Sequence, residues 1–63
     1  MDRADALDVL PEPYGLALTL RAAGHDEATI AERVDVPVDA IAALLEVGEA
    51  KLAVLLADSE LGM

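Results

Sequence analysis

The stretch DEATIAERVDVPVDAI, residues 26–41, decides the fold. It begins with Asp26, a residue type that caps helix N-termini well, and its apolar residues recur at helical spacing, which predicts a short helix over residues 27–33. A tight turn follows at Asp35–Val36, and the next apolar positions open a long helix that we expect over residues 38–58. The stretch therefore predicts two helices of unequal length joined by a few residues.

Two further helices are predicted before this stretch. The first covers residues 2–9 and ends before Pro11, since proline cannot continue a helix. The second covers residues 12–23, with Pro13 in its first turn, where the missing N–H does no harm, and Gly24 as its C-terminal stop. No stretch alternates apolar and polar residues as a half-buried strand would. We therefore expect an all-α fold, a small bundle of about four helices with a long C-terminal helix.

The composition limits how this bundle is stabilised. Of the 63 residues 56% are hydrophobic, yet Tyr14 is the one aromatic residue and cysteine is absent, so the core must consist of Leu, Val, Ile and Ala without disulfides. A single domain over residues 1–63 is expected, because one core usually takes about 50 to 200 residues. A domain this small buries only about 60% of the surface of its unfolded chain, which makes a partner an expected source of stability.

A short helix, a tight turn and a longer helix form the layout of a helix-turn-helix, and several short motifs make the match more specific. In chain order they are Leu10-Pro11-Glu12, Leu20-Arg21 at the end of an apolar helix, Ile30-Ala31-Glu32, Val36-Pro37 and Ala40-Ile41. Together they resemble region four of bacterial sigma factors, in unbroken register over residues 10–52. The resemblance implies a helix-turn-helix domain whose fourth helix would be the recognition helix for DNA.

Two departures from the family pattern bear on function. Asp35 stands where the family usually has glycine, at a turn position that often needs a positive φ, which Asp tolerates better than most residues. In the recognition helix, the family's basic residues, which contact phosphates and bases, fall here on apolar or acidic side chains. These positions are Ala42, Leu44, Glu46, Val47, Glu49 and Ala50, and only Lys51 keeps a positive charge.

The charge balance argues against DNA binding through that helix. Thirteen acidic residues face four basic ones, for a formal net charge of −9. Proteins that hold duplex DNA through its phosphates typically neutralise about 6 to 10 of them, and base readout relies mostly on Arg, Lys, Asn and Gln. The resemblance is therefore interpreted as a retained fold with a lost DNA contact. The acidic surface alone is also typical of a solubilising coat.

The fourth helix carries two apolar stripes. The first is expected to form the core with Leu10, Leu18, Ile30 and Val34, and consists of Ile41, Leu45, Leu52, Leu55 and Leu56, with Gly48 inside it. The second recurs at spacings of three and four, like a heptad seam, and consists of Ala43, Val47, Ala50, Val54, Ala57 and Leu61. A chain this short cannot cover both stripes. The alternative interpretation is that alanine is simply a good helix former and the valines are isolated exposed residues.

We therefore predict a transcription-associated protein that acts through protein–protein contacts, as a homodimer or by docking on a sigma factor or RNA polymerase component. The predicted interface consists of Leu16, Ala43, Leu44, Val47, Ala50, Val54 and Leu61. Two alternatives stay open, a DNA-binding regulator of the sigma region four type and an acidic inhibitor that mimics DNA.

Enzymatic chemistry is not expected. The single histidine, His25, has no cysteine to join it in a metal or catalytic site, and neither a cofactor nor a metal is predicted. Asp35 with Asp39, or Glu46 with Glu49, have the spacing of ordinary solvated helix faces. No apolar run approaches the roughly 20 residues of a membrane span, and the first residues lack the features of a signal peptide, so we expect a cytoplasmic protein.

Overall fold

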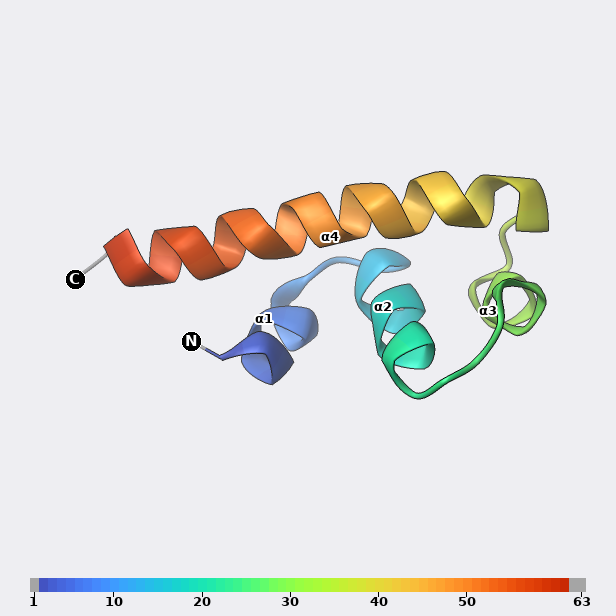
Figure 1. The fold of residues 1–63 in the computed structure, drawn as a ribbon, viewed down its shortest axis with the longest axis horizontal. Coiled ribbons are helices and arrows are strands. Elements are labelled where there is room, and N and C mark those ends of the chain that lie inside the picture. The colour runs from blue at the N-terminus through green and yellow to red at the C-terminus, as the bar shows by residue number, and fades with distance from the viewer. Residues whose placement is uncertain (1, 62–63) are drawn as a thin grey trace.

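The computed structural model describes the backbone of residues 2–61 and the side chains of residues 2–58. The elements in this part of the chain are α1 (Arg3–Val9), α2 (Tyr14–Ala22), α3 (Glu27–Val34) and α4 (Val38–Leu61). No strand occurs among the described residues. The predicted all-α class with a long C-terminal helix is therefore confirmed (Figure 1).

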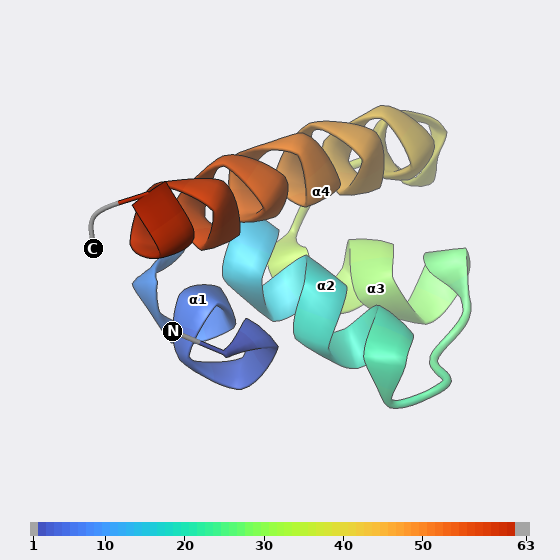
Figure 2. The ribbon, with the colours of Figure 1, turned by 60° about the vertical axis from the view of Figure 1, so that its left-hand side comes forward.

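The three short helices lie along one side of α4 (Figures 1 and 2). α1 lies against the C-terminal half of α4, α2 against its middle and α3 near its N-terminal end, and each contacts α4. α2 also contacts both α1 and α3. The molecule is elongated, 39 by 18 by 15 Å, because the 24 residues of α4 rise about 36 Å.

The two ends of α3 are fixed by local hydrogen bonds at Asp26 and Asp35. Oδ1 of Asp26 accepts the backbone N–H of Thr29 at 2.8 Å, as an N-cap does. Asp35 adopts the left-handed conformation, with φ 58° and ψ 47°. The backbone N–H groups of Asp35 and Val36 both donate to the carbonyl of Ala31, which ends the helix. The predicted turn is confirmed, and three residues, 35–37, separate α3 from α4.

The helix boundaries differ from the prediction most clearly at the start of α2. A start at residue 12 was expected, with Pro13 in the first turn. Instead, residues 12–13 form a turn in which the N–H of Tyr14 donates to the carbonyl of Pro11 at 3.0 Å. Pro13 has φ −92° and ψ 5°, which lies outside the helical range, so the helix begins only at Tyr14.

The other helix ends lie within a few residues of the predicted ones. α2 ends at Ala22, one residue early, and Gly24 stops it as expected by taking a φ of 97°. There the N–H groups of Gly24 and His25 close the helix onto the carbonyls of Arg21 and Leu20. α3 runs one residue and α4 three residues beyond their predicted ends.

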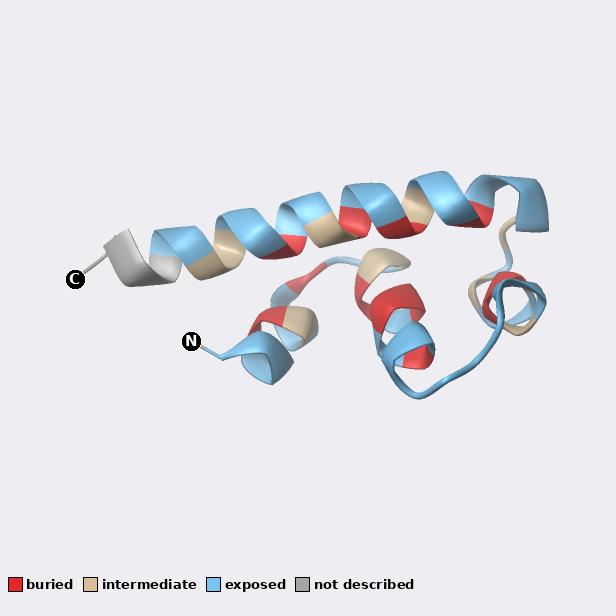
Figure 3. Cartoon of the chain, viewed as in Figure 1, coloured by how far each residue is buried: buried red, intermediate tan, exposed pale blue. Residues whose placement is uncertain are grey.

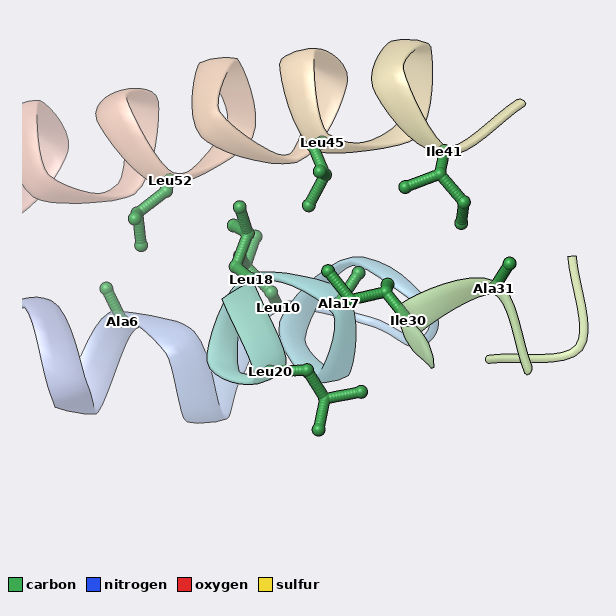
Figure 4. Packing of buried hydrophobic residues seen from close by; sticks show 10 residues of the cluster. All are labelled: Ala6, Leu10, Ala17, Leu18, Leu20, Ile30, Ala31, Ile41, Leu45 and Leu52. Carbon is green, nitrogen blue, oxygen red and sulfur yellow. The ribbon is translucent and has the colours of Figure 1, made fainter. Parts of the chain in front are cut away.

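One row of α4 side chains forms the core with residues of the three short helices (Figure 4). The predicted α4 residues Ile41, Leu45 and Leu52 are buried, whereas Leu55 and Leu56 lie half-buried at the edge of the core. Among their predicted partners Leu10, Leu18 and Ile30 are buried and Val34 is half-buried. The core also takes in further buried residues, among them Ala6, Ala17 and Leu20, which stand outside the predicted set.

Two glycines allow helices to approach closely. At Gly48 an added Cβ would lie 3.3 Å from Cδ1 of Leu18, so the Leu18 side chain packs directly on the backbone of α4. At Gly15 an added Cβ would lie 2.8 Å from the carbonyl oxygen of Leu7, so α2 packs on the backbone of α1. A larger side chain at either position would push the helices apart.

Gly48→Val is expected to destabilise the protein by about 1 to 3 kcal/mol, because the new side chain would overpack the contact with Leu18. Ala53→Val, at an exposed position of the same helix outside the second apolar stripe, is the matched control and should cost only about 0.5 kcal/mol of helix propensity. Urea denaturation followed by circular dichroism measures both free energies of unfolding. Equal stability of the two variants would contradict the close contact.

The Asp26 N-cap is expected to make stability depend on pH. The Asp26 carboxyl has a pKa below its ordinary value of 3.8, first of all because it accepts the backbone N–H of Thr29. A folded pKa below the unfolded one gives a contribution that is complete above the unfolded pKa and is lost as the pH falls through the folded pKa. Asp26→Asn keeps an acceptor oxygen but cannot titrate. We therefore expect the Tm of this variant to fall less than that of the wild type between about pH 5 and about pH 2. Parallel Tm curves in thermal melts would contradict this contribution.

Candidate functional site

The side of α4 that faces away from the three short helices is exposed over residues 38–58 (Figure 3). Four predicted interface residues form this outer face of α4, namely Ala43, Val47, Ala50 and Val54, and all four are exposed. Val47 is 43% and Val54 59% exposed. The second apolar stripe therefore stands free of the core, as the wheel pattern predicts.

The other predicted interface residues lie elsewhere. Leu44 is half-buried and packs against the core, because its position on the helix adjoins those of Leu55 and Gly48 rather than the middle of the outer face. Leu16 is exposed on α2, about 160° around that helix from Leu18, which packs on α4. Leu16 therefore points away from α4 and does not extend the outer face. The Leu61 side chain lies outside the described residues.

Cations near α4 are held in contacts within the molecule. Nη2 of Arg3 donates to Oε1 of Glu49 at 2.7 Å, an ion pair that joins α1 to α4. Nζ of Lys51 lies 5.3 Å from the centre of the Tyr14 ring, within the range of a cation–π contact. The remaining two basic residues, Arg21 and Arg33, belong to α2 and α3. The outer face of α4 therefore offers no cation to a phosphate.

A groove lies beside the outer face, between the end of α1 and α4. It has a volume of about 400 Å³ and is lined by Val9, Leu10, Pro11, Lys51, Val54 and Leu55. We name it the α1–α4 groove. Sequence reasoning missed it, because only Val54 of these residues was in the predicted interface. The one indication in the sequence was Val9, an apolar residue that the predicted core does not use. In the structure its side chain is 56% exposed.

A second hollow, of about 490 Å³, lies between the end of α2, the start of α3 and α4. Its lining mixes both signs of charge, since Arg21 and His25 stand beside Asp26 and Glu27. The Asp26 carboxylate already accepts the N–H of Thr29, so it is committed to the helix cap. Within the described part of the chain, no three His, Cys, Asp or Glu side chains are grouped so as to hold a metal ion. This hollow offers no organised chemistry.

Comparisons with protein-family models, with curated proteins and with solved structures found no match to this chain. None of the described helices is both long and apolar enough to cross a membrane.

Proposed function

We propose that this chain is a transcription-associated helix-turn-helix protein of the sigma region four type that acts through protein–protein contacts rather than by reading DNA. Its contact surface is the outer face of α4, and the occupant is a second copy of the chain or a helix of the transcription machinery in the cytoplasm. The observation that carries the proposal is that the outer face of α4, the helix that would read DNA, has exposed apolar side chains and no cation.

The arrangement of α3 and α4 supports the helix-turn-helix part of the proposal. A short helix, a turn of three residues and a long helix follow one another at the motifs Ile30-Ala31-Glu32 and Val36-Pro37. α3 is seen almost end-on where α4 runs across the view, so the two helices cross at a steep angle, as in helix-turn-helix proteins (Figure 1). Asp35 takes the positive φ that this turn position often needs.

The charges support the loss of DNA reading. Phosphate binding by duplex-binding proteins typically uses about 6 to 10 cationic contacts, and this chain has four Lys and Arg residues in all. Two of them, Arg3 and Lys51, are engaged within the molecule. An acidic mimic of DNA is less well supported, because such a protein would act through carboxylates and would have no use for an exposed apolar face.

The spacing of the outer face favours self-association. Ala43, Val47, Ala50 and Val54 follow at intervals of four, three and four residues, which is the repeat by which two helices pack along a common seam. The alanines are small and let a second helix approach closely. Homodimerisation is therefore the form of the proposal that is tested directly.

In a gel-shift experiment we expect no retardation of duplex DNA, even at low salt, because the outer face of α4 lacks cations for the phosphates. Low salt is the most sensitive condition, since phosphate binding strengthens as salt falls. Retardation that weakens steeply with rising salt would contradict the proposal and favour the DNA-binding regulator.

Val47→Glu is expected to dissociate the homodimer, because it places a charge in the middle of the seam. Val38→Glu is the matched control, since Val38 is similarly exposed but lies about 180° around α4 from Val47. Light scattering behind a sizing column at high micromolar concentration measures the mass of both variants and of the wild type. A wild-type monomer, or a dimer that tolerates Val47→Glu, would overturn self-association through this face.

A further inference from the structure

The two most exposed large apolar side chains among the described residues line the same groove. Val54 is 59% and Val9 56% exposed, and although one belongs to α4 and the other to α1, both line the α1–α4 groove. Scattered exposed valines need no explanation, but two that meet at a hollow mark a surface that burial would stabilise. The groove is therefore an apolar candidate docking surface.

The lining of the groove indicates an apolar side chain as its occupant. Five of its six residues are apolar, and the sixth, Lys51, has its ammonium group near the Tyr14 ring. Sites for small polar ligands have several converging polar groups that fix the ligand's orientation, which this groove lacks. Val47 lies two turns before Val54 on α4 and continues the apolar surface along the helix. A second helix laid along α4 would place apolar side chains in the groove.

Three acidic residues stand close along the chain to residues that line the groove. Asp8 and Glu12 adjoin its lining residues Val9 and Pro11 in sequence, and Asp58 follows Val54 by one helical turn. All three are exposed. We call these three acids the rim of the groove. Together with the net charge of −9 on the whole chain, they favour a partner that carries cations beside its apolar residues.

A second copy of this chain does not offer that combination. Its Arg3 is paired with Glu49 and its Lys51 lies against Tyr14, while Arg21 and Arg33 stand singly on two different helices. The chemistry of the groove and its rim therefore points to a different protein.

We propose that the α1–α4 groove binds a cationic amphipathic helix of another protein, with apolar side chains on its inner face and Lys or Arg on the flanks. This inference rests on the proposed function, since it names the chemistry of a protein partner. It concerns a surface that includes Val9, which lies off the outer face of α4.

The probe is a designed helical peptide with leucines along one face and lysines and arginines on both flanks, labelled for fluorescence anisotropy. A scrambled peptide of identical composition has the same charge but no apolar face. We expect the amphipathic peptide to bind at least about tenfold more tightly than the scrambled one. Equal affinity would mean charge attraction alone and would overturn the proposal.

Val9→Ser is expected to weaken binding of the amphipathic peptide about tenfold, whereas the matched control Val38→Ser leaves it unchanged. Both valines are exposed, so both variants should keep the helix content that circular dichroism measures. The rim is tested by Glu12→Gln combined with Asp58→Asn against Glu27→Gln combined with Glu32→Gln, four exposed acids in two pairs of equal charge. Only the first pair should weaken binding.

The groove proposal and the proposed function are overturned by different results. A Val9→Ser variant that binds the peptide as the wild type does would overturn the groove proposal, even if Val47→Glu still dissociates a dimer. DNA retardation or insensitivity to Val47→Glu would count against the proposed function, whereas tight binding of the amphipathic peptide that depends on Val9 would still support the groove.

Discussion

The contact between Leu18 and the backbone of α4 at Gly48 is the constraint on which the rest of the fold depends. α2 is the one short helix that contacts all three other helices, so its distance from α4 also sets where α1 and α3 can pack. With no side chain at Gly48, Leu18 reaches the α4 backbone, and Ile41, Leu45 and Leu52 close the core on either side of it. The missing side chain at Gly15 lets α1 follow α2 equally closely.

This packing leaves half of α4 without a partner. The three short helices cover one side of a helix that is about 36 Å long, and with their connections they are all of the remaining described residues. Small domains bury a small share of their surface, and here the uncovered share includes apolar residues such as Val47 and Val54. The exposed face thus belongs to a helix that is apolar on two sides and is covered on one of them by the described short helices.

Local features of the fold could be predicted from the sequence, because neighbouring residues determine them. The caps at Asp26 and Asp35 depend on residues within a few positions of each, and the buried row on α4 follows from helical spacing alone. The predicted start of α2 at residue 12 was wrong. Proline is compatible with a turn as well as with a first helical turn, and Pro13 adopts the turn conformation. Leu44 lies between the two apolar stripes of α4, so helical spacing alone does not predict whether it belongs to the core or to the outer face.

The α1–α4 groove could not be predicted in the same way. It forms where the end of α1 meets α4, residues far apart in the sequence, and no periodicity links Val9 with Val54. The contacts of Arg3 with Glu49 and of Lys51 with Tyr14 are long-range for the same reason.

These two contacts matter more for the surface than for stability. An exposed ion pair such as Arg3 with Glu49 contributes little to folding. Its effect, with that of Lys51 over Tyr14, is to hold the cations nearest α4 in contacts within the molecule, which leaves carboxylates and apolar side chains for a partner. Carboxylates repel phosphates, and an apolar face gains nothing from a polyanion. The same combination is complementary to a helix that carries apolar residues between cations, so charge and hydropathy favour the same class of partner.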